Sequence, residues 1–480
     1  MFEERLTEFE PIFYPRSIAV VGASASLNKA GSGWVMALRA AGFRGAVYPV
    51  GASGGTIAGL QIFPRLSLVP ADNIDYAIVA IPRESVLELL DECAAKKVKA
   101  VQFFTAGFSE LGEVEGHELE REMLKRARKS GIRIIGPNCI GIYCPEHNLP
   151  SPLGTIGKPG CVGFISQSGG VAAKLIEIGV ARHINYSKGV SFGNGIDLDA
   201  SDFLQYLGAD PKTRVVGAYL EGARDGRRLL STLKEVARTK PVILWKGGRT
   251  DVGAQVAMSH TGSLASPAAV WSGMLRQTGV IEVRSLEELS DALLCFQCSP
   301  YWKRGGIGIV GGLADGGGGI SVSASDACVE NGLDVPPLSQ ETRDNLAQIL
   351  GKVGSILRNP VDVSQAQPRG LPVLFQAIGL VARDTRIGLL LIQEDVDILL
   401  PVYSWKGVEE INEFFIHLVD KCNKPVVVVL PPGSAEKERL EVEQKLLAAR
   451  VAVFPSVERA AKAISRFKQY SRWQVGEDRL

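Results

Sequence analysis

Apolar and polar positions alternate along the whole chain with two different periods. Short runs rich in Val, Ile and Ala, such as RSIAVVGA (16–23) and YAIVAIP (76–82), are followed by turns and then by segments with apolar residues three and four positions apart. Short apolar runs predict buried strands, and the longer amphipathic segments predict helices. Strands that alternate with helices form parallel sheets with helices on both faces. The sequence therefore predicts an α/β protein with doubly wound parallel sheets.

The predicted strands fall into three groups. They are 16–23, 45–50, 76–82, 100–107 and 133–138 in the first group, 160–166, 215–222, 241–248 and 280–283 in the second, and 306–312, 387–393 and 425–432 in the third. The Pro-rich segment 143–160 and a break at 298–306 separate the groups. We therefore expect three domains, 1–145, 146–300 and 301–480, of which the second and third look like two copies of one architecture.

Composition and charge narrow the class of protein. Of the 480 residues 46% are hydrophobic, and 53 Lys plus Arg stand against 52 Asp plus Glu, which gives a net charge of +1. Such a balance offers no broad cationic surface for nucleic acid or anionic lipid. The longest apolar runs are far shorter than the ~20 residues of a membrane span, and the acidic N-terminus does not resemble a secretory signal. We expect a cytoplasmic protein with neither a membrane nor a nucleic acid as partner.

The eight Cys do not suggest a metal site. They are scattered along the chain, and Cys295 and Cys298 form a single C-x-x-C pair without a second pair or a His nearby. A zinc site needs further ligands at short spacing. We expect no bound metal on this chain and mostly buried, reduced thiols.

The loop after the first predicted strand, VVGASASLNKAGSG (20–33), is of a type that binds nucleotides. Gly is abundant in this chain, at 53 of 480 residues, and is preferred where the backbone must come close to another group. We expect the backbone N–H groups of Gly22, Ala23 and Ser24 to approach a phosphate at a helix N-terminus, where the helix dipole favours negative charge. The simpler alternative is that Gly22 only permits a tight turn.

The end of the second predicted strand bears on the kind of nucleotide. A NAD-binding domain usually places a carboxylate there to hold the adenosine ribose. Here the strand ends in Tyr48, Pro49, Val50 and Gly51, without a carboxylate. This difference disfavours an NAD-dependent oxidoreductase and favours another adenine nucleotide such as coenzyme A (CoA), whose ribose is phosphorylated.

Two further loops of the first group are candidate ligand contacts. IGPNCIG (135–141) follows the last strand of that group, and Pro137 and the glycines fix a turn that leaves Asn138 and Cys139 to contact a ligand. TAGFSE (105–110) is a similar loop. Each is equally well explained as a turn at a strand end, so neither is decisive alone.

The segment FISQSGG (164–170) runs from a strand into an Ala-rich helix. Ser166, Ser168, Gly169 and Gly170 offer hydroxyls and free N–H groups at the helix start, which favours phosphate binding. The Lys of a P-loop is missing, so the segment does not indicate a P-loop NTPase. In the alternative interpretation the two serines are plain N-caps.

The segment QVAMSHTGSLASP (255–267) contains His260, one of only five His in the chain, between small residues that leave room for a transferred group. A neutral imidazole is nucleophilic near pH 7 and suits a phosphoryl carrier. Glu221, in AYLEG at the end of a predicted strand, can accept the other ring N–H and so fix the tautomer. On their own, a lone His is more often an ordinary surface or core residue and a strand-end Glu is usually solvated.

Taken together and in this order, the motifs resemble the α-subunit of the nucleoside-diphosphate-forming acyl-CoA synthetases, relatives of succinyl-CoA synthetase. The matching pieces are PRSIAVVGAS, FTAGFSE, GPNCIG, FISQSGG, YLEG, SHTGS and NPVD, spread over nearly the whole chain. The resemblance implies a Rossmann-type CoA-binding domain followed by two flavodoxin-like ligase domains. It also implies the reaction acyl-CoA + Pi + ADP ⇌ carboxylic acid + CoA + ATP.

The resemblance also assigns roles to residues. His260 becomes the phosphohistidine and Glu221 its stabilising carboxylate. The CoA-binding residues that it implies are Gly22, Ala23, Ser24, Lys29, Pro49, Ile81, Pro82, Asn138 and Cys139. The phosphate-binding residues that it implies are Ser166, Ser168, Gly169 and Gly170. This chain departs from the family in VYPVGAS, where VYPVNP is common, and in GGLADGGGGIS, which leaves the role of the loop 315–319 open.

The family binds ADP or ATP and Mg²⁺ in an ATP-grasp module, which this sequence lacks. We therefore expect an ATP-grasp β-subunit as partner, in an αβ or α₂β₂ assembly. The alternative from another class is a CoA-binding regulatory or scaffolding protein without turnover, against which His260 and Glu221 argue. The acid stays open between acetate, a branched or aryl acid and a dicarboxylate, and so does the choice between ADP and GDP.

Overall fold

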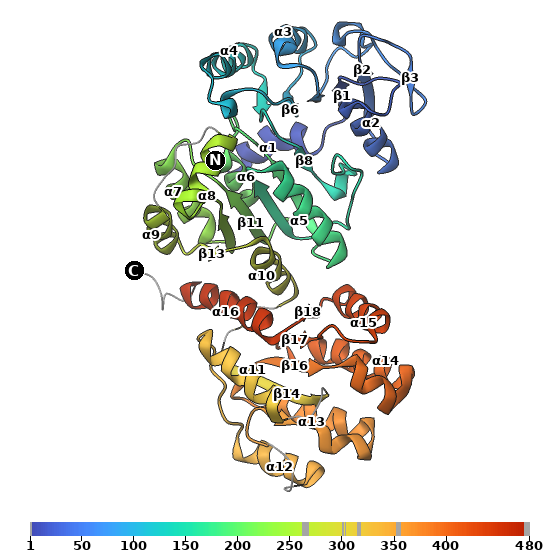
Figure 1. Cartoon of the computed structure of the whole chain (residues 1–480), viewed down its shortest axis with the longest axis vertical. Coiled ribbons are helices and arrows are strands. Elements are labelled where there is room, and N and C mark those ends of the chain that lie inside the picture. Colours follow the sequence, from blue (N-terminus) through green and yellow to red (C-terminus); the bar gives the residue numbers. More distant parts are fainter. Residues whose placement is uncertain are drawn as a thin grey trace. The chain divides into compact units, whose positions relative to one another are not determined.

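The computed structural model describes residues 2–261, 268–299, 302, 304–313, 318–351 and 357–474. These residues form two compact units, an N-terminal unit within 1–289 and a C-terminal unit within 290–479. Each unit consists of mostly parallel sheets with helices packed on their faces (Figure 1). The predicted α/β class with doubly wound parallel sheets is confirmed, whereas the division into three domains stays a prediction.

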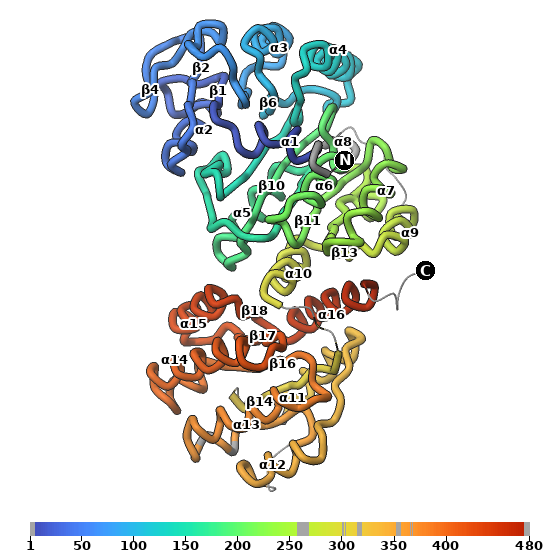
Figure 2. Tube along the Cα trace, turned by 180° about the vertical axis from the view of Figure 1, so that it is seen from behind, coloured from blue at the N-terminus to red at the C-terminus, as the bar shows by residue number. Residues whose placement is uncertain are grey.

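The first sheet of the N-terminal unit has the strand order β2-β1-β5-β6-β7, and all of its pairs are parallel. Its strands are β1 (Ser17–Val21), β2 (Ala46–Val50), β5 (Tyr76–Val79), β6 (Ala100–Phe103) and β7 (Arg133–Ile135). Its helices are α2 (Ala30–Ala40), α3 (Val86–Ala95) and α4 (Val114–Ser130). Helices α3 and α4 lie side by side, apart from α2 (Figure 2). The strand order reverses between β1 and β5, which is where an open sheet of this kind binds its ligands.

Short elements connect these strands. They are the two-stranded sheet of β3 (Thr56–Ile57) and β4 (Leu60–Gln61) and the 3₁₀ turns η1 (Leu66–Leu68), η2 (Arg83–Ser85), η3 (Ser109–Leu111) and η4 (Pro145–His147). Of these, η2 and η3 follow β5 and β6 directly and therefore lie at the carboxyl edge of the first sheet.

The second sheet has the order β13-β12-β11-β9-β10-β8, and only β8 runs antiparallel to its neighbour. Its strands are β8 (Gly141–Tyr143), β9 (Val162–Ser166), β10 (Tyr186–Ser191), β11 (Val215–Leu220), β12 (Val242–Lys246) and β13 (Ile281–Val283). Its helices are α5 (Gly169–Ala181), α6 (Ala200–Ala209), α7 (Gly226–Ala237), α8 (Asp251–Thr261) and α9 (Ala268–Thr278). Helix α10 (Leu286–Cys298) follows β13.

The N-terminal helix α1 (Phe2–Phe13) helps to join the two sheets into one unit. It precedes β1 of the first sheet but packs against α6 of the second. Phe9 and Phe13 stack on Tyr206 with ring centroids 4.9 and 4.7 Å apart, and both side chains are fully buried. An element that precedes the first sheet is thereby anchored to a helix of the second sheet.

The C-terminal unit contains a parallel sheet of order β15-β14-β16-β17-β18. Its strands are β14 (Gly306–Leu313), β15 (Val361–Asp362), β16 (Ile387–Glu394), β17 (Val426–Val429) and β18 (Ala452–Phe454). Its helical elements are α11 (Gly318–Glu330), α12 (Gln340–Leu350), η5 (Ser364–Arg369), α13 (Leu371–Arg383), α14 (Val396–Cys422), α15 (Glu436–Ala448) and α16 (Val457–Gln474). Strands β14 and β16 are buried along their whole length, as their continuous apolar sequences predict.

Six of the described strands were not predicted from the sequence. Five of them, β3, β4, β8, β15 and β18, are only two or three residues long. The sixth, β10, reads YSKGVS and carries Lys188 at its centre, so it does not read as a continuous apolar run. Lys188 is nevertheless buried, because its ammonium pairs with Asp210 Oδ2 at 2.9 Å. A buried cation is tolerated when it is paired, and this pairing cannot be read from the strand alone.

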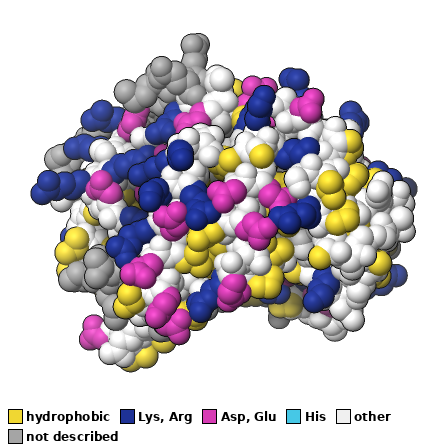
Figure 3. Space-filling model, turned by 90° about the horizontal axis from the view of Figure 1, so that it is seen from above, with side chains coloured by type: hydrophobic (Ala, Val, Ile, Leu, Met, Phe, Trp, Pro, Cys, Tyr) yellow, Lys and Arg dark blue, Asp and Glu magenta, His cyan; other side chains and the backbone are white. Residues whose placement is uncertain are grey.

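The surface agrees with the charge balance. The face drawn in Figure 3 carries Lys and Arg intermixed with Asp and Glu rather than a field of one sign. Among the helices that the structure describes, none combines the length and the apolar character that crossing a membrane would require.

Candidate active site

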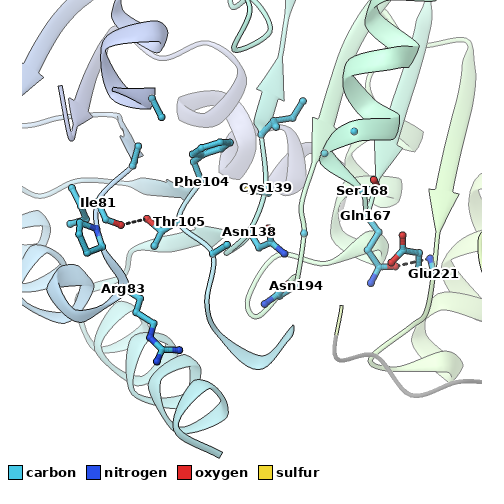
Figure 4. Close-up of a pocket in the computed structure, with 18 residues that line it drawn as sticks. Ile81, Arg83, Phe104, Thr105, Asn138, Cys139, Gln167, Ser168, Asn194 and Glu221 are labelled. Atoms are coloured by element: carbon cyan, nitrogen blue, oxygen red, sulfur yellow. Dashed lines mark hydrogen bonds between the residues drawn. The ribbon is translucent and has the colours of Figure 1, made fainter. Parts of the chain in front are cut away.

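A cavity of about 540 Å³ lies within the N-terminal unit, at the carboxyl ends of strands from both sheets (Figure 4). Its wall includes loops that follow β5, β6 and β7 in the first sheet and β9, β10 and β11 in the second. It is lined by Ala30, Ala80, Ile81, Pro82, Arg83, Phe104, Thr105, Ala106, Asn138, Cys139, Ile140, Gln167, Ser168, Gly169, Gly170, Gly193, Asn194 and Glu221. The cavity thus brings together eight of the residues predicted from sequence, namely Ile81, Pro82, Asn138, Cys139, Ser168, Gly169, Gly170 and Glu221.

The loop after β1 is closed tightly on itself. Gly22 has φ +99°, and a Cβ on it would lie 2.2 Å from the carbonyl oxygen of Ala80. A Cβ on Gly31, the second residue of α2, would lie 2.5 Å from the backbone of Gly22. Only glycine fits at either position, so the tight-turn interpretation of Gly22 describes the structure correctly.

The amides of this loop do not form the phosphate cradle that the sequence suggested. The N–H groups of Gly22 and Ala23 both donate to the carbonyl oxygen of Val50, at 2.9 and 3.0 Å. The N–H of Ser24 donates to Ser32 Oγ at 3.0 Å. These three donors are used within the fold, so the structure does not present them as free donors for a phosphate. Contact of these residues with CoA through other atoms stays a prediction.

Lys29, Pro49 and Ser166 do not line the cavity. Lys29 is the N-cap residue of α2, and its side chain is exposed. Gly51, where the family commonly has Asn, lies so close to the loop that a Cβ would be 1.9 Å from Ala23 O. The departure from the family pattern therefore reflects a close backbone approach.

Hydrogen bonds connect the loops that follow β5, β6 and β7. Thr105 Oγ1 donates to the carbonyl oxygen of Ile81 at 2.8 Å, and the N–H of Asn138 donates to the carbonyl oxygen of Thr105 at 2.9 Å. Cys139 lies beside Asn138 in the wall, but burial raises the pKa of its thiol to about 12. A thiol with so high a pKa is a poor nucleophile, which disfavours Cys139 as an acyl carrier.

The start of α5 faces the cavity. Ser168 is the N-cap residue, and its Oγ accepts the N–H of Val171 at 3.3 Å. Ser166 Oγ donates to the carbonyl oxygen of Ser168 at 2.6 Å and accepts the N–H of Ser168 at 3.2 Å. Both serine hydroxyls thus stabilise the turn, as the capping alternative expects. Gly169 and Gly170 follow in the cavity wall at the positive end of the helix dipole.

Glu221 lies opposite this helix start, just past the end of β11. Its Oε1 accepts the hydroxyl hydrogen of Tyr219 at 3.0 Å. Its Oε2 is buried and has no hydrogen-bond partner among the described residues. Lys246 contributes positive charge nearby, and burial lowers the pKa of its ammonium while the charge of Glu221 opposes that shift. A buried carboxylate oxygen without a partner is costly unless a donor arrives from a ligand or from another side chain.

Several cavity residues were missed by the sequence reasoning. Gln167 lies inside the predicted Ser motif, but its amide was not considered. Asn194 is flanked by Gly193 and Gly195, both with positive φ, and such a Gly-Asn-Gly turn is the one signal that marked it. Asn194 Nδ2 donates to Glu110 Oε2 at 2.7 Å and so connects the second sheet to η3.

His260 lies near the end of α8, which runs beside η3. The side chain of His260 lies outside the described residues, and so do residues 262–267 and most of the Gly-rich loop at 315–319. The structure therefore shows where Glu221 and the start of α5 lie, whereas the role of His260 stays a prediction.

Comparison with known proteins covers almost the whole chain. Residues 16–145 match the family model "CoA binding domain", residues 159–296 the model "Succinyl-CoA ligase like flavodoxin domain" and residues 310–480 the model "Ligase-CoA domain". The chain is 33% identical over 476 residues to the α subunit of acetate–CoA ligase [ADP-forming] I of Pyrococcus furiosus, with 97% of this chain and 98% of that protein covered. The chain belongs to the ADP-forming acyl-CoA synthetases.

Other members of the ADP-forming acyl-CoA synthetases are longer. The chain is 38% identical over 475 residues to acetate–CoA ligase [ADP-forming] I of Archaeoglobus fulgidus, which covers 98% of this chain but only 64% of that protein. Among solved structures, a dinucleotide-forming acetyl-coenzyme A synthetase 1 of Ca. Korarchaeum cryptofilum, in complex with phosphate and ADP, matches with a TM-score of 0.86, 29% identity and 98% of both chains covered. The family predicted from the motifs is confirmed, and with it an acid–thiol ligase of the α-subunit type. The comparisons give no support to the scaffolding alternative.

Proposed function

We propose that the cavity holds the thioester end of an acyl-CoA together with inorganic phosphate, and that His260 takes up the phosphoryl group formed there. The observation that carries this proposal is the buried Oε2 of Glu221, which lacks a donor among the described residues. An imidazole N–H supplies the missing donor, and accepting it fixes the ring so that the other nitrogen keeps its lone pair. Helix α8, which carries His260 near its end, lies beside η3.

The reaction then proceeds in balanced steps. A phosphate oxygen attacks the thioester carbon, the C–S bond breaks, and CoA leaves as a thiol with the proton that phosphate gives up. The free nitrogen of His260 attacks phosphorus, the P–O bond to the acyl group breaks, and the carboxylate leaves. Transfer of the phosphoryl group from His260 to ADP yields ATP. The start of α5 stabilises the negative charge that develops on the phosphoryl oxygens.

The cavity wall fits the thioester arm of CoA. Beginning at the start of α2, the wall is formed by small or apolar side chains. These are Ala30, Ala80, Ile81, Pro82, Phe104 and Ala106. Such a wall suits an extended, mostly apolar chain with few hydrogen-bonding groups. Lys29 offers its ammonium to the phosphate groups outside the wall. We propose residues 1–145 as the CoA-binding domain, followed by ligase domains 146–300 and 301–480.

The acid is proposed to be a monocarboxylic acid. Arg83 is the only cationic residue among those that line the cavity. Its Nη1 donates to the carbonyl oxygen of Gly107 at 2.5 Å and lies 3.6 Å from Glu113 Oε2. A second substrate carboxylate would therefore have to compete with these contacts for the guanidinium. Acetate, the acid in the names of several relatives, meets this requirement.

We further propose an ATP-grasp β-subunit that binds ADP or ATP and Mg²⁺. The support is that similar proteins are named α subunits and that longer relatives extend beyond the part matched here. The expected assembly is αβ or α₂β₂ in the cytoplasm. Glu221 and His260 require no metal on this chain, and no cluster of acidic, His or Cys side chains that would suit a metal is found among the described residues.

The proposal is tested by measuring CoA release from acetyl-CoA with and without phosphate, using a thiol reagent and the purified chain. Phosphate-dependent release of one CoA per chain is expected without nucleotide, and continuous release is expected once ADP, Mg²⁺ and the partner are added. Succinyl-CoA is expected to react at least tenfold more slowly. Continuous release in a His260→Ala variant would contradict the proposal.

A further inference from the structure

Gln167 makes an unusual pair of contacts in the cavity wall. Its side-chain Oε1 accepts the backbone N–H of Glu221 at 2.8 Å and the backbone N–H of Gly222 at 3.1 Å. Its own backbone N–H donates to the carbonyl oxygen of Tyr219 at 3.0 Å. Gln167 is only 8% exposed. One side chain from the end of β9 thus holds the stretch of backbone from which Glu221 projects.

These contacts also fix the direction of the amide. Since both backbone groups are donors, the atom that faces them must be the oxygen, and the NH₂ group must point the other way. Figure 4 shows the nitrogen of Gln167 turned away from the backbone of Glu221. The NH₂ group has no acceptor among the described residues, although Gln167 lines the cavity.

The position of this donor suggests what it binds. Gln167 directly precedes Ser168, Gly169 and Gly170, the start of α5 that faces the cavity. A neutral NH₂ donor in the wall beside a helix N-terminus suits an oxyanion, because both are hydrogen-bond donors that bring no negative charge. Glu221, held by the same side chain, is the group proposed to hold the imidazole. Gln167 therefore holds the backbone of Glu221 and shares the cavity wall with the start of α5.

We propose that Gln167 is a phosphate-binding residue of this enzyme, whose NH₂ group donates to the phosphoryl oxygens while its carbonyl oxygen positions Glu221. This inference rests on the proposed function, because it takes the phosphoryl group to lie between the start of α5 and Glu221. The proposal adds a side-chain donor, the NH₂ group of Gln167, to the backbone N–H donors that the Ser-Gly-Gly turn is predicted to offer to phosphate.

The variant Gln167→Glu separates the two roles. It keeps an oxygen that accepts both backbone N–H groups, so the position of Glu221 and the stability of the chain are expected to stay as in the wild type. It replaces the NH₂ donor by a carboxyl oxygen, which repels phosphate when ionised and donates when protonated. The phosphate concentration that gives half-maximal CoA release is expected to rise at least tenfold at pH 8, with the acetyl-CoA requirement changed less than twofold.

The pH dependence distinguishes a direct contact from a structural one. As the pH is lowered from 8 to 5, the new carboxyl group takes up a proton and recovers a donor, so the difference between variant and wild type is expected to shrink. A merely structural defect would not follow this titration. Gln205→Glu is the matched control, because Gln205 lies on α6 outside the cavity wall and undergoes the same chemical change. Its phosphate requirement is expected to equal that of the wild type.

A second measurement does not depend on turnover. Inorganic phosphate should protect the wild-type chain against thermal unfolding, and the midpoint of that protection should move at least tenfold higher in Gln167→Glu at pH 8. If the wild type releases no CoA, the proposed function fails while the protection experiment still tests Gln167. Equal phosphate midpoints for the wild type and Gln167→Glu at pH 8 would overturn the inference.

Discussion

The hydroxyl of Tyr219 donates to Oε1 of Glu221 at 3.0 Å, while Oε2 of the same carboxylate is buried without a partner among the described residues. The hydrogen bond from Tyr219 fixes the rotation of the carboxylate, and the contacts from Gln167 fix the backbone from which the Glu221 side chain projects. Burying a charged oxygen without a donor has a free-energy cost that is removed only when a donor arrives. This arrangement supports the proposal that Glu221 accepts an N–H from a group that enters the cavity.

Replacing Glu221 by Gln tests this proposal. Gln keeps an oxygen for the hydroxyl of Tyr219 but presents NH₂, a donor, where the imidazole N–H needs an acceptor. The rate of phosphate-dependent CoA release is expected to fall about 10²–10⁴-fold, with the fold intact. Stopped-flow measurement of CoA release gives the rate, and circular dichroism checks the fold.

The control for this variant is Glu235→Gln. Glu235 lies on an exposed position of α7 and does not line the cavity, so the same change in charge should leave the rate within twofold of the wild type. A wild-type rate of CoA release in Glu221→Gln would show that Oε2 of Glu221, which has no partner among the described residues, is not needed for the reaction.

Two glycines in the same loop and helix are expected to respond oppositely to alanine. Gly22→Ala forces a Cβ to within 2.2 Å of Ala80 O at φ +99°, so it should destabilise the N-terminal unit by at least about 1–3 kcal/mol and weaken CoA binding. Gly33→Ala meets nothing within 4 Å inside α2 and should stabilise the chain by about 0.5–1 kcal/mol. Urea denaturation and calorimetric titration with CoA measure both effects. Equal stabilities for the two variants would refute the close packing described for this loop.

Cys139 is expected to be unreactive although it lines the cavity. With a pKa of about 12, roughly one thiol in ten thousand is ionised at pH 8, and the thiolate is the reactive form. Iodoacetamide should therefore modify the partly exposed Cys161 and Cys422 in the native chain well before Cys139. Peptide mass spectrometry gives the order of modification. Rapid alkylation of Cys139, suppressed by acyl-CoA, would instead suggest a covalent role for this thiol.

Glu394 makes the stability of the C-terminal unit depend on pH. Burial raises the pKa of its carboxyl from 4.5 to about 8, although a hydrogen bond from Asn412 Nδ2 at 3.0 Å acts in the opposite direction. Between those two values the folded protein holds a proton that the unfolded chain has lost. The stabilisation is fully present below about pH 4.5 and is lost as the pH rises through about 8, at up to about 1.4 kcal/mol per pH unit.

Glu394→Gln removes this titration while keeping an acceptor for Asn412. Hydrogen exchange of peptides from β16 and α14 should show a wild-type opening free energy that falls from pH 5 to pH 8, after correction for the intrinsic exchange rate. The variant should show a flat profile over the same range. Parallel profiles in both proteins would mean that Glu394 is ionised throughout.

The sequence predicted the parts of this structure that depend on local pattern. The strands β1 and β16 are continuous apolar runs with sharp ends, so their positions followed directly. The carboxyl-edge loops were located because Gly, Ser and Pro mark them, and Ser168, Asn138 and Glu221 came together in one cavity. The predicted ends of β5, β6 and β7 lie beyond the ends that the structure shows. The residues that follow these strands are small or apolar because they line the cavity, not because they belong to the sheet.

What the sequence did not predict depends on contacts between distant residues. Gln167 and Glu221 are 54 positions apart and meet only because β9 and β11 are neighbours in the sheet. Strand β10 was not predicted because it contains Lys188, and the partner that allows Lys188 to be buried, Asp210, lies after the next helix. The amides of the loop after β1 were expected to be free, but the end of β2 lies close enough to accept two of them.

The most direct test of the central claim is to map the phosphoryl group. The wild-type chain is incubated with acetyl-CoA and ³²P-labelled phosphate without nucleotide, and labelled peptides are identified by mass spectrometry at alkaline pH. The account predicts one acid-labile, base-stable phosphate on the peptide that contains His260, lost in His260→Ala and strongly reduced in Glu221→Gln. Label on any other residue, or undiminished label in His260→Ala, would contradict it.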